Sequence, residues 1–94
     1  MNILIVEDNN DINNMIKNYL TKAGYNCEQA FSGTEALMYF KMNTYDLIIL
    51  DLMLPGMNGE SLLENIRQTS DLPVIVLTAK DTLDSKVEVL GAGA

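Results

Sequence analysis

Carboxylate side chains follow two apolar runs of this sequence, and their placement could bind a metal ion or a phosphoryl group. Glu7 and Asp8 come directly after the run at residues 3–6, and Asp51 follows the run at residues 47–50. Unbroken apolar runs of this length are typical of strands that are buried on both faces of a parallel sheet. Open parallel sheets bind their ligands just outside the carboxyl ends of the strands. We therefore expect the three carboxylates to converge at one edge of a sheet.

Three carboxylates in one place repel one another unless a cation joins them. Two unit charges about 4 Å apart repel by roughly 4 kcal/mol at an effective dielectric constant near 20. The chain has no histidine and only 6 Lys and Arg residues, of which Lys80 alone follows an expected strand end. Mg²⁺ prefers carboxylate oxygens and keeps several waters, so it is the cation we expect here. The other interpretation is that Glu7 and Asp8 are solvated loop acids that favour the start of a helix.

A hydroxyl and a backbone N–H group follow a third apolar run. Thr78 and Ala79 come after residues 74–77, so they would lie near the same edge of the sheet. Phosphoryl transfer depends mainly on in-line positioning and charge stabilisation, and an Asp can itself be the nucleophile that forms an aspartyl phosphate. Thr is common in strands, so Thr78 has little weight without the acidic residues.

Apolar periodicity and capping signals predict the elements that position these side chains. The expected strands are residues 3–6, 25–31, 47–50 and 74–77, and the second of them is polar enough to be an edge strand. A first helix is indicated by one apolar stripe that ends before Gly24. Its members are Ile12, Met15, Ile16, Tyr19, Leu20 and Ala23.

Three further helices are expected from the sequence. Ser32 and Glu35 form a capping box at the start of the second, which fades near Asn43. The third follows the turn at residues 55–59, carries Leu62, Leu63 and Ile66, and gives way to a polar loop at residues 68–71. The fourth would begin at Asp81 or Thr82, and its inner face and end would be Leu83, Val87, Leu90 and Gly91.

This alternation of strands and helices predicts an α/β fold, a doubly wound parallel sheet with helices on both faces. The most apolar early strands, residues 3–6 and 47–50, should be neighbours, and residues 25–31 should lie at an edge. Counted along the chain, the expected strand order is 2-1-3-4. The gap between the first and third strands is then the switch point at which ligands bind.

Composition limits the class of protein further. The chain has 94 residues, which suits one small domain, and 13 acidic residues against 6 basic ones give a net charge of −7. This balance argues against binding nucleic acid or an anionic membrane by electrostatics. The single cysteine, Cys27, excludes internal disulfides and is expected to be an apolar filler. Acidic residues from position 7 onward come too early for a signal peptide or membrane span, so we expect a cytoplasmic location.

Taken together, these motifs resemble the receiver domain of two-component response regulators. The resemblance runs through the whole chain: VED at 6–8, LIILDLMLPGMNG at 47–59, VIVLTA at 74–79 and LGAGA at 90–94. It implies that Asp51 is the phosphoacceptor for a sensor histidine kinase, that Thr78 is the switch hydroxyl, and that the backbone N–H of Ala79 meets the phosphoryl group. It also implies a Mg²⁺ site made by Asp8, Asp51 and the backbone carbonyl of Met53, with Glu7 acting through water.

The resemblance also implies what is missing from residues 1–94 and what the domain would do. The family's fifth β-α unit, with its phosphate-binding lysine, is absent, so we expect a receiver domain that is incomplete at its C-terminus. It would be a phosphoacceptor and self-dephosphorylating switch rather than a dedicated enzyme. Contact with DNA would require a C-terminal effector domain. Without the fifth unit, we expect one of two outcomes. Either the chain self-associates, for example as a homodimer, through the edge of residues 74–77 and the bare face of the first helix, or these residues belong to a longer protein that contains the remainder.

Three other functions have to be weighed against this one. A phosphatase of the haloacid dehalogenase type needs a second Asp two residues after the first, where this chain has Met53. A flavodoxin-type nucleotide binder needs a neutral loop rich in glycine and hydroxyl groups, and EDNND at 7–11 would repel phosphate. A degenerate receiver that serves only as an interaction module is favoured by the missing unit alone.

Overall fold

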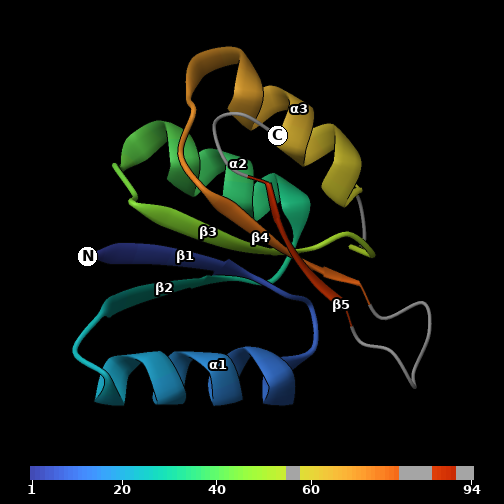
Figure 1. The fold of residues 1–94 in the computed structure, drawn as a ribbon. Coiled ribbons are helices and arrows are strands. Elements are labelled where there is room, and N and C mark those ends of the chain that lie inside the picture. Colours follow the sequence, from blue (N-terminus) through green and yellow to red (C-terminus); the bar gives the residue numbers. More distant parts are fainter. Residues whose placement is uncertain (55–57, 79–85, 91–94) are drawn as a thin grey trace.

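One mixed sheet separates two layers of helices in the structure, a computed structural model that describes residues 1–54, 58–78 and 86–90 (Figure 1). The strand order in this part of the chain is β2-β1-β3-β4-β5. The strands are β1 (Asn2–Val6), β2 (Asn26–Ala30), β3 (Leu47–Asp51), β4 (Val74–Thr78) and β5 (Lys86–Leu90). The helices are α1 (Asn10–Lys22), α2 (Gly33–Met42) and α3 (Gly59–Thr69).

The first four strands confirm the predicted doubly wound topology. β1 pairs in parallel with both β2 and β3, and β3 pairs in parallel with β4, which gives the order 2-1-3-4. Figure 1 shows α2 and α3 above the sheet and α1 below it. The expected edge strand is indeed β2, whose residues are only partly buried until Ala30. This arrangement brings the carboxyl ends of β1 and β3 side by side.

Our prediction of a helix from Asp81 or Thr82 to Leu90 is wrong for residues 86–90. These residues form β5, which pairs antiparallel with β4 from Thr78↔Lys86 to Val74↔Leu90. The sequence KVEVL alternates in character with a period of two, and its two Val residues favour a strand. Pairing with β4 satisfies backbone groups that a helix would have left exposed. The expected start of that helix lies outside the described residues.

This fifth strand also corrects the predicted route of self-association. The outer edge of β4 is paired with β5, so Val74 to Leu77 do not offer the free edge on which that route depended. The remaining route, through the outer face of α1, stays a prediction.

The sheet buries a large hydrophobic cluster on one face and a smaller one on the other, as far as the structure describes the chain. The larger cluster lies under α2 and α3 and contains Leu4, Val6, Ala30, Ala36, Tyr45, Ile48, Leu50, Leu62, Ile66, Val74 and Val76. The smaller cluster consists of Ile3, Ile5 and Ile49, and Ile16 and Leu20 of α1 pack against it. Alternate residues of β1 and β3 point to opposite faces, which explains the division. Cys27 packs partly buried against the smaller cluster, in agreement with its expected role as a filler.

The inner face of α1 contains fewer of the apolar residues than we predicted. Met15 and Tyr19 are 63% and 75% exposed, whereas Ile16 and Leu20 turn toward the sheet. The third residue on the inner face is Asn13, which is fully buried. A polar residue thus occupies a position where the hydrophobic pattern alone would not place one.

Local signals at the helix ends are largely confirmed. The Ser32 hydroxyl accepts a hydrogen bond from the Glu35 N–H at 3.1 Å, while the Glu35 carboxylate accepts from the N–H of Phe31, one residue before the cap. Gly24 follows α1 with a positive φ of 99°, a conformation that glycine adopts without strain. Helix α3 continues to Thr69, which is further than the predicted start of the polar loop.

Candidate metal and phosphoryl site

The predicted acidic residues come together at the carboxyl ends of β1 and β3. Glu7, Asp8 and Asp51 each offer a carboxylate oxygen, and these oxygens all lie within 4.8 Å of one another. Glu7 and Asp51 are buried, with 6% and 7% of their surface exposed, whereas Asp8 is exposed. The cluster therefore has a closed side within the protein and an open side toward solvent.

Strand register accounts for this convergence. Val6 pairs with Leu50, so Glu7 and Asp51 follow at the same level on neighbouring strands. Neighbouring strands lie about 4.8 Å apart, which is close enough for side chains at one level to meet. The same register that packs the apolar residues of β1 and β3 thus sets the spacing of the acids.

Burial among acids changes the protonation of Glu7. Its pKa is raised to about 7, chiefly because burial disfavours the charged carboxylate, and the neighbouring Asp8 and Asp51 raise the pKa further. A hydrogen bond from the Asn9 N–H to Glu7 Oε2 at 3.1 Å acts in the opposite direction. At a separation of about 4.8 Å, two ionised carboxylates repel by roughly 3.5 kcal/mol at an effective dielectric constant of 20.

These features fit a hard divalent cation. The cluster supplies carboxylate oxygens only, and its open side leaves room for water ligands, as Mg²⁺ requires. A cation there would relieve both the repulsion and the burial of charge.

The backbone after β3 is held against the carboxylate of Asp51. The N–H of Met53 donates to Asp51 Oδ1 at 3.0 Å, which fixes the orientation of that carboxylate. Residue 53 is Met, so no second acid stands where a dehalogenase-type phosphatase would need one. The predicted metal-binding role of the Met53 carbonyl stays a prediction.

Gly59 lets the first turn of α3 lie directly on this backbone. Its N–H donates to the carbonyl of Leu52 at 3.1 Å. A Cβ at Gly59 would stand 2.5 Å from Leu52 Cα and 2.8 Å from the carbonyl oxygen of Asp51, both far below normal contact. Only glycine fits this approach. The side-chain amide oxygen of Asn58 caps the helix by accepting a hydrogen bond from Ser61 N–H at 2.8 Å. The sequence predicted a turn before α3, but it did not reveal this reason for the glycine.

The structure describes only part of the predicted phosphoryl-binding pair. Thr78 is the last residue of β4, and because Asp51 pairs with Leu77, the backbone of Thr78 lies one residue beyond the level of Asp51. Ala79 and Lys80, like the turn residues 55–57, lie outside the described residues.

Asn13 is a residue of the site that the sequence patterns did not predict. Its side-chain Nδ2 donates to the carbonyl oxygens of Glu7 and Ala30, at 3.0 and 3.1 Å. A signal was present, because Asn13, Ile16 and Leu20 have the spacing of one helix face and a polar residue in that row needs an explanation.

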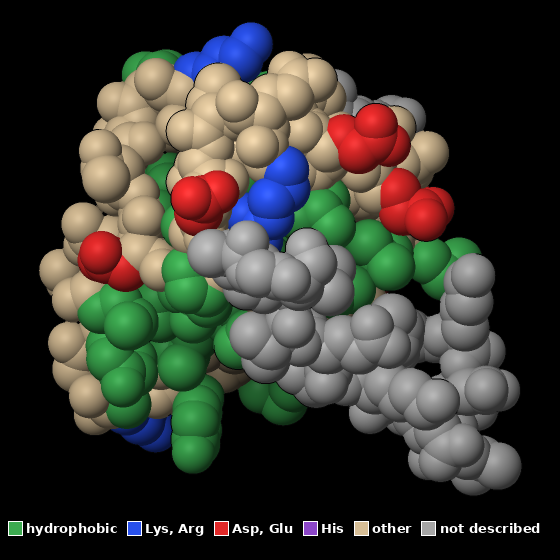
Figure 2. All heavy atoms as spheres, turned by 45° about the horizontal axis from the view of Figure 1, so that its top comes forward, with side chains coloured by type: hydrophobic (Ala, Val, Ile, Leu, Met, Phe, Trp, Pro, Cys, Tyr) green, Lys and Arg blue, Asp and Glu red, His purple; other side chains and the backbone are tan. Residues whose placement is uncertain are grey.

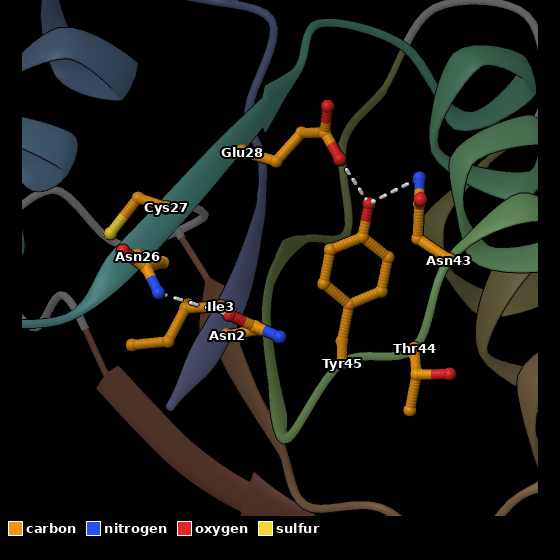
Figure 3. Close-up of a pocket in the computed structure, with 8 residues that line it drawn as sticks. All are labelled: Asn2, Ile3, Asn26, Cys27, Glu28, Asn43, Thr44 and Tyr45. Atoms are coloured by element: carbon orange, nitrogen blue, oxygen red, sulfur yellow. Dashed lines mark hydrogen bonds between the residues drawn. The ribbon is translucent and has the colours of Figure 1, made fainter.

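A second, unrelated hollow lies at the amino ends of the strands, away from the acids (Figure 3). It has a volume of about 450 Å³, and its wall includes Tyr45, whose hydroxyl donates to Glu28 and accepts from Asn43 Nδ2 at 3.3 Å. Burial and the hydrogen bond to Glu28 raise the pKa of Tyr45 to about 12. These hydrogen bonds join β2 to the segment before β3, so the polar groups of Glu28, Asn43 and Tyr45 have a structural role in this hollow.

The described surface is consistent with the acidic composition. On the face shown in Figure 2, Lys and Arg side chains do not gather into a basic patch. Among the described residues, no helix has the length and apolar character needed to cross a membrane.

Comparison with known proteins identifies the family. Residues 3–94 match the response regulator receiver domain. YcbL of Bacillus subtilis, an uncharacterised transcriptional regulatory protein, is 43% identical over 91 residues, which are 97% of this chain and 40% of YcbL. The regulatory protein VanRB of Enterococcus faecalis is 40% identical over 98% of this chain and 42% of its own length. The chain thus spans about 40% of the length of these curated relatives.

Solved structures agree with the sequence comparison. The receiver domain of a Francisella response regulator has a TM-score of 0.81 at 38% identity, over 85% of this chain and 67% of the other. The response regulator TrrA of Thermotoga maritima, solved in complex with Mg²⁺-BeF, has a TM-score of 0.80 at 38% identity, over 86% of this chain and 71% of the other. From the matched residues, the shared fold and these identities, the chain belongs to the response regulator receiver domain family.

Proposed function

We propose that this chain is the phosphoacceptor domain of a two-component system and that Asp51 takes the phosphoryl group from a sensor histidine kinase. The observation that carries the proposal is the buried carboxylate of Asp51, the last residue of β3, within 4.8 Å of two other acids. One of its oxygens accepts the Met53 N–H, which leaves Oδ2 as the attacking oxygen. The transfer forms a P–O bond to Asp51 and breaks the P–N bond of the phosphohistidine, whose electron pair returns to the imidazole nitrogen.

Glu7, Asp8 and Asp51 would hold Mg²⁺ in this reaction, with the Met53 carbonyl as a further ligand and Glu7 acting through water. The ion would neutralise charge on the phosphoryl oxygens during transfer. The relative TrrA was solved with Mg²⁺-BeF, and the present acids have the ligand chemistry for the same ion. Deprotonation of Glu7 is favoured once a cation is near, because the charged form then has a partner.

Thr78 and Ala79 complete the proposed site. The end of β4 lies beside the end of β3, since Asp51 pairs with Leu77. The Thr78 hydroxyl and the Ala79 N–H would bind phosphoryl oxygens and carry the change of state to the rest of the protein. Phosphorylation and its hydrolysis would make the domain a switch rather than a dedicated enzyme.

We further propose that the domain regulates transcription in the cytoplasm. Its relatives are named as transcriptional regulatory proteins, and each is more than twice as long as the matched segment. With a net charge of −7, the receiver itself is a poor ligand for DNA, so a C-terminal effector domain would make that contact.

Acetyl phosphate offers a direct test of the phosphoacceptor. Incubation with acetyl phosphate and Mg²⁺ should add one phosphoryl group, seen by intact-mass measurement, and Asp51→Asn should abolish it. Asp46→Asn is the matched control, because Asp46 is an exposed acid just before the amino end of the same strand, where it accepts the Asn2 N–H at 2.8 Å. An adduct that survives in Asp51→Asn would overturn the assignment.

A further inference from the structure

Asn13 joins the acidic loop to its surroundings through a closed set of hydrogen bonds. Its Nδ2 donates to Glu7 O at 3.0 Å and to Ala30 O at 3.1 Å. The N–H of Glu7 also donates to Ala30 O at 3.1 Å. Both backbone polar groups of Glu7 are therefore held, one by β2 and the other by α1.

The energetics of Asn13 call for a function beyond packing. Its side chain is fully buried, and its Oδ1 has no hydrogen-bond partner among the described residues. A buried polar atom without a partner destabilises a protein by about 1–3 kcal/mol. Leu has the same number and branching of side-chain heavy atoms and would avoid this loss, so the two bonds from Nδ2 are what Asn13 provides.

The position of these bonds relates them to the acids. The carbonyl that Asn13 holds belongs to the peptide between Glu7 and Asp8, so its orientation sets the direction in which Asp8 leaves the strand. The Glu7 side chain is separately fixed by the Asn9 N–H at Oε2. Asn13 is neutral, so it fixes the loop without supplying the positive charge that a cation would bring.

We propose that Asn13 is a positioning residue for the cation site: it holds the Glu7–Asp8 peptide in the orientation that lets both acids and Asp51 meet one ion. The inference rests on the proposed function, since it assumes that the acidic cluster binds Mg²⁺. Groups that orient metal ligands from outside the coordination shell typically change metal affinity by about 10–100-fold.

Two substitutions separate this role from simple packing. Asn13→Leu keeps the branched side-chain skeleton and removes the donor, whereas Asn13→Ala removes both. Mg²⁺ is titrated into each variant while the Asp8 amide resonance of the folded protein is followed, so a loss of stability does not enter the measured affinity. We expect both variants to bind Mg²⁺ about tenfold or more weakly than the unaltered protein.

Tyr45→Phe is the matched control. It also removes hydrogen bonds from a buried side chain, but it lies roughly 20 Å from Asp51 along β3, and its Mg²⁺ affinity should be unchanged. Wild-type affinity in Asn13→Leu would overturn the inference, and so would weakening in Asn13→Ala alone, which would indicate a packing role.

A measurement on the unaltered protein covers the case in which a variant does not fold. Saturating Mg²⁺ should shift the side-chain amide resonances of Asn13, and resonances that do not respond would overturn the inference. Failure of the proposed function is distinguishable, because the unaltered protein would then show no Mg²⁺-dependent shift at Asp8 or Asp51 either.

Discussion

Replacing Gly59 by Ala should disturb both the stability of the fold and the geometry of the site. The added Cβ would lie 2.5 Å from Leu52 Cα, 2.8 Å from Asp51 O and 3.0 Å from Leu52 C, all backbone atoms that cannot rotate away. Reaching ordinary contact requires the start of α3 to move by roughly 1 Å. That shift lengthens the bond from Gly59 N–H to Leu52 O and loosens the turn that holds Asp51.

The expected loss of stability follows from these contacts. Overpacking typically destabilises by about 1–3 kcal/mol, and a weakened backbone hydrogen bond adds about 1 kcal/mol. Alanine returns up to about 1 kcal/mol through its better helix propensity. We therefore expect Gly59→Ala to lower the free energy of unfolding by roughly 1–3 kcal/mol, a large part of the 5–14 kcal/mol or so expected for a domain of this size.

Urea denaturation measures that loss, and Gly24→Ala is its control. Gly24 has an unusual φ of 99° but nothing within 4 Å of an added Cβ, so its substitution introduces backbone strain without a clash. Gly24→Ala should lose about 1–2 kcal/mol and leave the Met53 amide resonance and Mg²⁺ affinity unchanged. Gly59→Ala should change the stability, the Met53 amide resonance and the Mg²⁺ affinity. If Gly59→Ala keeps both wild-type stability and the wild-type Met53 resonance, the close approach of α3 to β3 is refuted.

Three other predictions concern protonation, the metal and a helix cap. Folding raises the pKa of Glu7 from 4.5 to about 7. The stabilisation of the folded state by protonated Glu7 is therefore fully present below pH 4.5 and is lost as the pH rises through 7. Metal-free protein should thus lose up to about 3 kcal/mol of unfolding free energy across that range, less where solvent screens the group. Denaturation of Glu7→Gln should show a flatter pH profile. Mg²⁺ at 100 times its Kd should raise the unfolding free energy by about 2.7 kcal/mol, which calorimetry with and without EDTA measures. At a fixed Mg²⁺ concentration this increase should be larger at pH 8 than at pH 6, because at pH 8 Glu7 has no proton to release when the ion binds. Ser32→Ala removes the acceptor for Glu35 N–H and should cost about 1 kcal/mol in urea denaturation, with no change in Mg²⁺ affinity.

The acidic cluster was predictable because parallel strands end at a common edge. Two apolar runs, each followed by acids, are sufficient to bring Glu7 and Asp51 together once the runs are neighbours in register. The same reasoning gave the order of the first four strands, since the two runs that are buried on both faces must lie inside the sheet.

Features that depend on contacts between distant segments could not be predicted from the local sequence pattern. Helical spacing places Asn13 on the face of Ile16 and Leu20, but it does not reveal the carbonyl groups of Glu7 and Ala30 that Asn13 binds there. The apolar spacing of Leu83, Val87 and Leu90 fits a helix, but pairing with β4 makes residues 86–90 a strand. Gly59 is required by the backbone of Leu52, and no local signal indicates that approach.

The unequal layers on the two faces of the sheet, in the part of the chain that the structure describes, imply that the domain does not open uniformly. Separation of α1 exposes Ile16, Leu20 and the smaller cluster, while the larger cluster under α2 and α3 stays closed. Local unfolding of α1 therefore needs less free energy than global unfolding, and its amide hydrogens should exchange before those of β3. The same opening carries Asn13 away from Glu7. If the acids bind an ion only while α1 is docked, each tenfold rise in ion concentration above Kd slows exchange in α1 about tenfold. Docking of α1 and occupancy of the acidic cluster are then one coupled equilibrium, in which binding of the ion stabilises the docked position of α1.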